Sequence, residues 1–409
     1  MKEAEAAVVE ALDAGAAPSR PRVVTTLGIA QTLAWASSYY LPAILAEPIA
    51  AGTGVAPAWV FAAFSASLLI AAVAGPFVGR AIDRQGGRGV LALSSVVLAV
   101  GLLALAAASG PVGLFAAWAI LGLGMALGLY DAAFAALASL YGTNARGPIT
   151  GITLMAGFAS TVSWPLSSLL NDAVGWRETC LIWGALNLVV CLPLNALLPR
   201  SARRAPARAA NRRRIGWHPR REMLLLAFVF AAAWFVTGAM AAHLPDLLER
   251  AGATPFAAVG AAALVGPAQV VARLIEFILL RRIHPLVSAR LAAALHPIGA
   301  AVLALTGAAG AAPFAILYGA GNGLLTIARG TVPLALFGPN AYGERTGLLG
   351  APARAAQALA PLLFGLLLGT IGLAAIFVSA GLCVAALAAL LCLRARDSAV
   401  ETPLSRENA

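Results

Sequence analysis

Long apolar stretches follow one another along most of the chain, with only short polar breaks between them. Stretches such as LLIAAVAGPFVG and AALAALLCL show no alternation of apolar and polar residues, so they do not predict the strands of a transmembrane barrel. Apolar stretches of about twenty residues are long enough to cross a bilayer as helices. The pattern predicts an all-α membrane protein with twelve transmembrane helices, near residues 24–47, 57–78, 89–109, 112–141, 149–170, 178–198, 222–245, 256–280, 287–308, 312–337, 346–369 and 371–394.

The composition excludes a soluble globular domain. Hydrophobic residues make up 61% of the 409 residues and charged residues 11%, and the mean hydropathy is +0.87. In soluble domains about a quarter of the residues are charged. The first 22 residues carry four acidic side chains and no apolar core, so we expect a cytoplasmic tail rather than a cleavable signal peptide.

The net charge of +11 is concentrated on one predicted side of the membrane. Of the 28 Lys and Arg residues, 23 lie in the two tails and the connectors on the same side, and 2 lie on the opposite side. This distribution predicts that both termini are cytoplasmic, in a bacterial inner membrane. Nine arginines fall between Arg200 and Arg221; topology and anionic lipid headgroups explain them better than a nucleic-acid partner does.

One connector occurs twice. The sequence YGTNARGPITG at 141–151 returns as FGPNAYGERTG at 337–347, and the same offset places Pro165 and Pro361 in equivalent positions. An even number of predicted spans separates the copies, which indicates a parallel repeat of two six-helix halves. The predicted organisation is an N-terminal tail, a first half, a basic linker, a second half and a C-terminal tail, at 1–23, 24–198, 199–221, 222–394 and 395–409.

The connector after the second span carries a recognisable motif. It reads GRAIDRQGGRGVL and resembles the signature of the major facilitator superfamily, in which an acidic residue acts as a latch between the two halves. The residues in register are Gly79, Asp83, Arg84, Gly86 and Arg88. The resemblance implies a conformational latch here, whose partner would be the start of the eleventh span near Arg345.

Two further segments refine the resemblance. In WAILGLGMA, which resembles another superfamily element, Trp118 stands at the arginine position, so that element's role in proton handling is not carried over. The region from LPAILAEP to the motif, together with GWRET, is similar to the bacterial monocarboxylate porter and oxalate/formate-type branch. That similarity implies that Arg273, on the eighth span, binds a substrate carboxylate. Gln269 stands where several members carry an acidic residue.

Five charged residues lie inside predicted spans: Asp131, Arg273, Glu276, Arg329 and Arg354. Each is costly in a bilayer and needs a partner or a function. Four of them, all except Glu276, are predicted roughly 11–15 Å deep, near the middle of the membrane. The excess of arginine favours an organic anion, because a guanidinium binds a carboxylate through two hydrogen bonds. Arg273, Arg329 and Arg354 are therefore predicted to bind substrate.

The two carboxylates are candidates for proton coupling. A carboxyl group away from water holds a proton more readily than one at the surface, which favours Asp131 and, secondarily, Glu276. Two alternatives remain open at this point. Asp131 could form a permanent salt bridge with Arg329 or Arg354, and Glu276 could form a neutral pair with Arg273 on its own helix.

Two polar stripes at helical spacing could line a central cavity. One stripe comprises Tyr318, Asn322, Thr326 and Arg329, and the other comprises Gln31, Trp35, Ser38 and Tyr39. From these stripes we predict Tyr318, Asn322, Tyr39, Gln31 and Trp35 as substrate-binding residues. Interhelical hydrogen bonding is the alternative explanation for both stripes.

Together these features predict a secondary transporter that moves a small organic anion, such as a monocarboxylate, with protons. The predicted partners are the anion, a coupling ion and membrane lipids, and we expect a monomer. No nucleotide-binding loop, metal-ligand spacing or catalytic set occurs in the sequence, so neither a cofactor nor an enzymatic activity is predicted. A drug or metabolite efflux pump is the main alternative, and a non-transporting membrane sensor a weaker one.

Overall fold

The computed structural model describes residues 19–200 and 221–393, and this part of the chain is helical with no strand. The fold class predicted from the sequence is confirmed. The predicted N-terminal and C-terminal tails and the arginine-rich linker lie largely outside the described residues. That topology and anionic lipid headgroups account for the arginines of this linker therefore stays a prediction.

The first half of the chain folds into helices that match the first six predicted spans. They are α2 (Arg20–Ala36), α3 (Pro42–Thr53), α4 (Pro57–Gln85), α5 (Gly87–Ala106), α6 (Gly110–Gly128), α7 (Tyr130–Tyr141), the short helix η1 (Gly142–Ala145), α8 (Arg146–Ala156), α9 (Ala159–Val174), α10 (Trp176–Leu186), the π-helical turn η2 (Asn187–Cys191) and α11 (Leu192–Ala196).

The second half matches the other six predicted spans. Its helices are α12 (Arg221–Arg250), α13 (Pro255–Ala263), α14 (Val265–Ile278), η3 (Leu280–Arg282), α15 (Pro285–Thr306), η4 (Gly307–Gly310), α16 (Ala311–Phe337), α17 (Tyr342–Ile371), η5 (Gly372–Ala374) and α18 (Ala375–Leu391). The boundary predicted at 369–372 is present, because α17 ends at Ile371 and Gly372 turns the chain with a φ of 57°.

The helices are long and apolar enough for a multi-pass membrane protein. Among the described residues, eight helical stretches qualify as membrane spans by length and composition, and several contain more than one predicted span, as Pro285–Phe337 and Tyr342–Leu391 do. The first predicted span corresponds to α2 and α3, which are separated by a break at residues 37–41.

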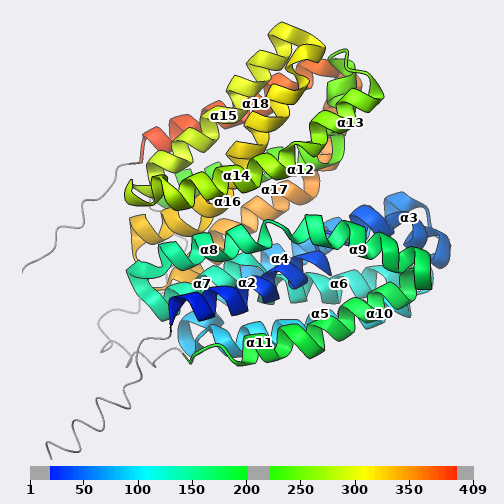
Figure 1. The fold of residues 1–409 in the computed structure, drawn as a ribbon, viewed down its shortest axis with the longest axis vertical. Helices are drawn as coiled ribbons and strands as arrows, with labels where there is room; N and C mark the ends of the chain where they lie inside the picture. Colours follow the sequence, from blue (N-terminus) through cyan, green and yellow to red (C-terminus); the bar gives the residue numbers. More distant parts are fainter. Residues whose placement is uncertain (1–18, 201–220, 394–409) are drawn as a thin grey trace, which may run out of the picture.

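Two bundles lie side by side in Figure 1, one formed by α2 to α11 and the other by α12 to α18. The start of α2, the end of α11 and the end of α18 lie at the same end of the molecule. We call this the terminal end and the opposite one the far end. Each bundle has its own apolar core, in which Trp118, Trp183 and Phe134 of the first half and Phe230 and Phe314 of the second are fully buried.

Several predicted spans are broken inside the bundle. The backbone leaves the helical conformation at residues 37–41, at Leu129 and at 157–158, and α13 passes to α14 at Leu264. A broken membrane helix leaves backbone groups unpaired, which is tolerated where protein or a cavity satisfies them. At Leu129 this is observed directly, because the Gln31 side chain donates a 2.5 Å hydrogen bond to the Gly128 carbonyl. Such breaks mark binding sites in many transporters.

Glycines bring α4 and α17 into close contact across the two halves. A side chain at Gly79 or at Gly343 would overlap the backbone of the other residue, and a Cβ at Gly347 would lie 2.6 Å from the Gly75 carbonyl oxygen. This packing uses the glycines of the predicted latch motif and of the second connector copy. It joins the terminal ends of the two halves.

Candidate functional site

A buried charge cluster joins the two halves at their centre. Asp131 of α7 accepts a hydrogen bond from Arg329 of α16 and forms an ion pair with Arg354 of α17, each at 2.6 Å. All three side chains are at most one-tenth exposed. The alternative of a salt bridge at Asp131 is therefore what the structure contains, and it involves both arginines. We call these three residues the triad.

The surrounding helices explain this arrangement. Asp131 lies in the first turn of α7, just after the break at Leu129, where the helix dipole favours a negative charge. Arg354 also donates to the Ala71 carbonyl of α4 at 2.8 Å, and the Arg329 guanidinium lies 4.6 Å from the centre of the Trp234 ring. With two arginines and one carboxylate, the triad carries a net charge of +1 when all three groups are ionised.

Arg273 is not part of the triad, although the sequence predicts it at a similar depth. It is 5% exposed and donates to the Thr153 carbonyl and to the Gln269 side chain, each at 3.2 Å, while its Nε has no partner among the described residues. A side chain at Gly157 would overlap the Arg273 guanidinium, so the break between α8 and α9 makes room for it. These contacts are all neutral, and none brings a carboxylate to Arg273.

Glu276 does not pair with Arg273, in contrast to the alternative considered from helical spacing. Its side chain is 1% exposed and accepts from Arg146 at 2.9 Å and from Ser288 at 2.7 Å. Arg146 also donates to the carbonyls of Leu280 at 3.0 Å and Ile283 at 2.5 Å. We call these contacts the Arg146 clamp. They tie the start of α8 to the end of α14, across the two halves.

The predicted latch motif makes a second contact at the terminal end. The Asp83 carboxylate accepts from the backbone N–H groups of Gly343 at 2.9 Å and Glu344 at 2.8 Å, at the first turn of α17. Arg80 adds a 3.4 Å ion pair with Glu344. Asp83 thus reaches the segment expected for its partner. Gly86 ends α4 with a φ of 82°. Within residues 19–200 and 221–393, Arg84 and Arg88 add no hydrogen bond or ion pair between the halves to these contacts.

Some residues of the two polar stripes line a cavity, and others make contacts between helices. A small cavity beside the triad is lined by Trp35, Tyr39, Tyr130, Trp234 and Gln357, among others. Other stripe residues make interhelical contacts instead. Gln31 binds the Gly128 carbonyl, Asn322 accepts from Thr237 at 2.9 Å, and the Tyr318 ring lies 5.7 Å from that of His296 inside the second half.

A sequence comparison places the chain in a family. The profile described as Major Facilitator Superfamily matches residues 27–328, well over half of the chain. The chain belongs to this superfamily. The resemblance carried by the motif at Gly79–Leu91 is thereby confirmed at the level of the superfamily, whereas the monocarboxylate branch stays a prediction.

Individual relatives of this superfamily protein are distant. The chain is 32% identical over 180 residues to an "Uncharacterized 38 kDa protein in 23S RNA operon" of Thermoproteus tenax, a match that covers 43% of this chain and 44% of that protein. The match thus spans less than half of the relative's length. Among solved structures, the human organic anion transporter MFSD10 (TETRAN) has a TM-score of 0.68 at 16% identity, over 91% of this chain and all of that chain. The structural likeness shows the superfamily fold.

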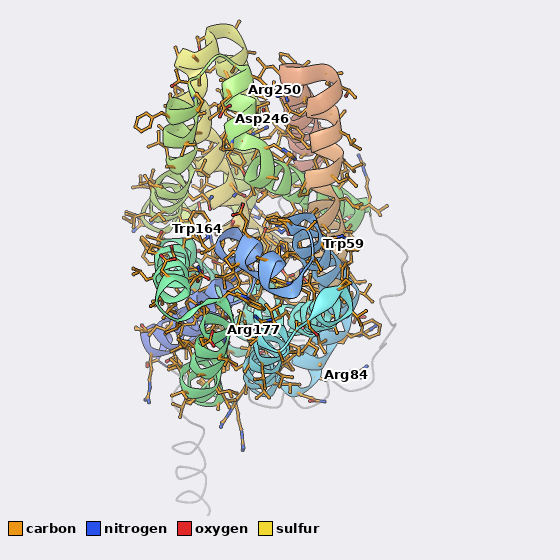
Figure 2. All side chains as sticks on the ribbon, turned by 90° about the vertical axis from the view of Figure 1, so that its right-hand side faces the viewer. Trp59, Arg84, Trp164, Arg177, Asp246 and Arg250 are labelled. Carbon is orange, nitrogen blue, oxygen red and sulfur yellow. The ribbon has the colours of Figure 1, made fainter. Side chains whose placement is uncertain are left out.

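Contacts between the halves of this superfamily transporter are grouped toward the terminal end. The Asp83 latch and the Arg146 clamp lie there, the triad lies deeper, and farther along α17 the Gln357 side chain donates to the Tyr39 hydroxyl at 2.5 Å. Figure 2 shows the far end, with Asp246 and Arg250 in the second half and Trp59 and Arg177 in the first. Asp246 and Arg250 pair with each other at 3.0 Å, within α12. In this conformation the two halves are thus joined most firmly at the terminal end.

Four residues of this site were missed by sequence reasoning: Trp234, Tyr130, Gln357 and Arg146. Trp234 lies in a uniformly apolar segment, and Tyr130 directly precedes Asp131, a neighbouring position that could have been used. Gln357 follows Arg354 by three residues and so shares its helix face, a spacing that could have been used. Arg146 differs between the two connector copies, but only the fold shows that it reaches Glu276.

Metal-binding chemistry has no support in the described part of the chain. No group of three His, Cys, Asp or Glu side chains comes together there. His243 bonds to the Pro361 carbonyl at 2.8 Å within the second half. Cys180, Cys191 and Cys383 are buried free thiols among apolar side chains.

Proposed function

We propose that the protein is a secondary active transporter that carries a small organic monocarboxylate across the membrane by alternating access. The observation that carries this proposal is Arg273, a buried guanidinium whose contacts are neutral and whose Nε is unpaired. A buried cation without a counter-charge is costly, and a substrate carboxylate would supply that charge. The solved relative described as an organic anion transporter supports the same substrate class.

Proton coupling is proposed at the triad. Asp131 bridges the halves through two arginines, so protonating its carboxylate would neutralise one side of both ion pairs and weaken the contact. Glu276, the second predicted coupling residue, is held in the Arg146 clamp, away from the cavity lining. We therefore assign coupling to Asp131 and a conformational role to Glu276.

We also propose that the terminal end faces the cytoplasm of a bacterium. Arg80, Arg84, Arg88 and Arg146 lie near this end, which agrees with the positive-inside rule. The structure would then represent a state closed toward the cytoplasm. Labelling single cysteines at Arg84 and at Trp59 with an impermeant reagent in intact cells tests the orientation. Labelling at Arg84 without labelling at Trp59 would overturn it.

Uptake of labelled carboxylates into proteoliposomes tests the transport function, with an inward proton gradient as the driving force. We expect Arg273→Ala to abolish uptake and Asp131→Asn to remove its dependence on the gradient. Arg250→Ala is the matched control, because Arg250 is exposed at the far end and pairs only locally. Unchanged uptake in both the Arg273 and the Asp131 variants would refute the proposed site.

The alternative of an efflux pump has one observation in its favour, the aromatic side chains Trp35, Tyr39, Tyr130 and Trp234 in the cavity lining. Aromatic walls suit large apolar compounds. A pump of this kind would export dyes or drugs in exchange for protons and would retain that activity in Arg273→Ala. Measuring dye efflux and carboxylate uptake in the same variant separates the two functions.

A further inference from the structure

Asp131 lies between two cavities. It lines the cavity beside the triad, which has a volume of about 20 Å³ and which we call the triad cavity. It also lines a second cavity of about 10 Å³, and among the described residues no other lines both. The residue proposed for proton coupling thus meets a cavity on two sides.

The second cavity lies between Asp131 and the Asp83 latch, and we call it the glycine cavity. At one end a Cβ at Gly350 would lie 3.0 Å from Asp131 Oδ2, and at the other end the Gly343 N–H donates to Asp83. Gly350 follows Gly343 by seven residues, roughly 10 Å along α17. The lining between these points comprises Gly75, Val78, Gly79, Ala126, Asp131, Ala132, Gly343 and Gly347.

One oxygen of the Asp131 carboxylate is available on this route. Arg329 and Arg354 both contact Oδ2, each at 2.6 Å, and Oδ1 accepts no hydrogen bond from the described residues. A buried ionised oxygen without a donor is costly. A cavity of about 10 Å³ is close to the volume that one water molecule needs, so water is the donor that fits.

The glycine cavity offers such a water further partners. The Gly75 carbonyl oxygen is the atom nearest to a Cβ at Gly347, at 2.6 Å, and the Gly79 carbonyl oxygen is the atom nearest to a Cβ at Gly343. These oxygens therefore face the crossing of α4 and α17. A water that donates to Asp131 and to a backbone carbonyl has the polar partners that a buried water requires.

The charged groups that face Asp131 lie on its other side. Arg329 and Arg354 line the triad cavity and do not line the glycine cavity. The Tyr342 hydroxyl, the nearest titratable group at the start of α17, donates to the Gly330 carbonyl at 2.6 Å. Within the described lining of the glycine cavity, Asp131 is the one side chain that can carry a proton, so transfer toward the latch needs water.

We propose that the glycine cavity holds a water molecule that takes the proton from Asp131 and releases it at the terminal end when the Asp83 latch opens. This inference rests on the proposed function, in which Asp131 is the coupling residue. The carboxyl O–H bond breaks, its electron pair stays on the carboxylate, and the proton passes through the water to the solvent. The carboxylate then pairs again with Arg329 and Arg354, which brings the halves back together.

Infrared difference spectra of the purified full-length protein in lipid nanodiscs test for this water. The difference between acid and alkaline pH contains the C=O band of protonated Asp131, which is assigned by its loss in Asp131→Asn. We expect an O–H band that changes together with this C=O band. The O–H band should shift when the solvent is enriched in a heavy oxygen isotope, because it belongs to water.

Three variants assign the band to the glycine cavity. Ala132→Val fills the cavity with an apolar side chain and should remove the water band. Ala132→Thr has nearly the same volume and supplies a hydroxyl in place of the water, which separates the loss of a proton carrier from the effect of added bulk. Ala133→Val is the matched control and should keep the band, since Ala133 is buried on the same helix and lies outside both linings.

Uptake of labelled lactate into proteoliposomes tests the release of the proton. Ala132→Val should slow net uptake driven by a proton gradient at least about tenfold, because a hydrogen bond to a charged group is worth that much or more. Exchange of lactate for lactate should continue in this variant, since Asp131 keeps its proton during exchange. Ala132→Thr should restore most of the net uptake.

The outcomes separate this inference from the proposed function. A C=O band of Asp131 without the water band, or a water band that persists in Ala132→Val, would overturn the glycine cavity as the proton exit while leaving Asp131 as the coupling residue. An equal loss of net uptake and exchange in Ala132→Val would do the same. If Asp131 shows no C=O band at any pH at which the protein is folded, proton coupling at Asp131 fails as well; the infrared result does not depend on lactate being a substrate.

Discussion

The Arg146 clamp allows a quantitative prediction about the conformational equilibrium. In the Arg146→Ala variant, Glu276 keeps Ser288 as a partner but loses its counter-charge, and the carbonyls of Leu280 and Ile283 each lose a donor. The three contacts that Arg146 makes, with Glu276, Leu280 and Ile283, all cross between the halves. They exist only while the terminal ends are together, so their loss should weaken this conformation specifically.

The structure sets the size of the effect. Removing one partner of a fully buried ion pair costs about 3–5 kcal/mol. Glu276 is buried, but the Arg146 side chain is 21% exposed, so water offsets part of the loss. We therefore expect the closed terminal end to be destabilised by about 1–3 kcal/mol, which corresponds to a shift of roughly 5- to 150-fold in the equilibrium.

Distance measurements between spin labels in lipid nanodiscs can detect this shift. Labels at Arg84 and Arg282 report on the separation of the terminal ends, after the exposed Cys392 has been replaced by serine. The wild-type protein should give mainly the short distance. Arg146→Ala should raise the population at the long distance by the factor given above.

A matched control tests the reasoning. Arg290 also donates to carbonyls at a helix end, those of Leu390 and Leu393, but inside the second half. Arg290→Ala should therefore lower thermal stability without changing the distance distribution. If Arg146→Ala and Arg290→Ala give the same distribution, the clamp does not control the equilibrium and the argument is wrong.

Three further predictions concern the helix contacts around the site. Gly347→Val should abolish the short distance between the same labels, because its Cβ would lie 2.6 Å from the Gly75 carbonyl, and an unchanged distribution would contradict the close α4–α17 packing. Asp83→Asn removes a charge at the start of α17, worth about 0.3–1 kcal/mol, and should shift the equilibrium by about two- to fivefold. In Gly157→Ala the new methyl group overlaps the Arg273 guanidinium, so carboxylate affinity measured by calorimetry should fall at least about tenfold, the value of 1.4 kcal/mol. Retained affinity in that variant and in Arg273→Ala would show that Arg273 does not bind the anion.

Most of the fold could be predicted from the sequence because membrane helices are local features. Apolar length defines each span, and the glycine turns between spans, such as Gly372, are visible in the chain. The breaks within spans were not predicted. Leu129 and the residues at 157–158 lie inside predicted spans, and the contacts that satisfy the broken backbone come from other helices.

The candidate site was predicted in part. Hydropathy identifies a charge inside a span because the bilayer makes it costly, which is how Asp131 and the three arginines were found. Depth along a span was not enough to group them. Arg273 shares the predicted depth of Arg329 and yet contacts Thr153, since the rotation of each helix about its axis decides which neighbour a side chain meets.

The sequence alone thus determined the membrane class, the apolar helical stretches and the list of charged residues within them, whereas the duplication of the two halves stays a prediction. Tertiary structure alone decided how those charges pair. Asp131 pairs with Arg329, which lies 198 positions away in the sequence, and Glu276 pairs with Arg146, which lies 130 positions away. Arg273, close to Glu276 in the sequence, contacts the Thr153 carbonyl and no carboxylate. The physical reason is that a buried charge takes the partner brought closest by helix packing, and packing between distant segments is not encoded in local spacing.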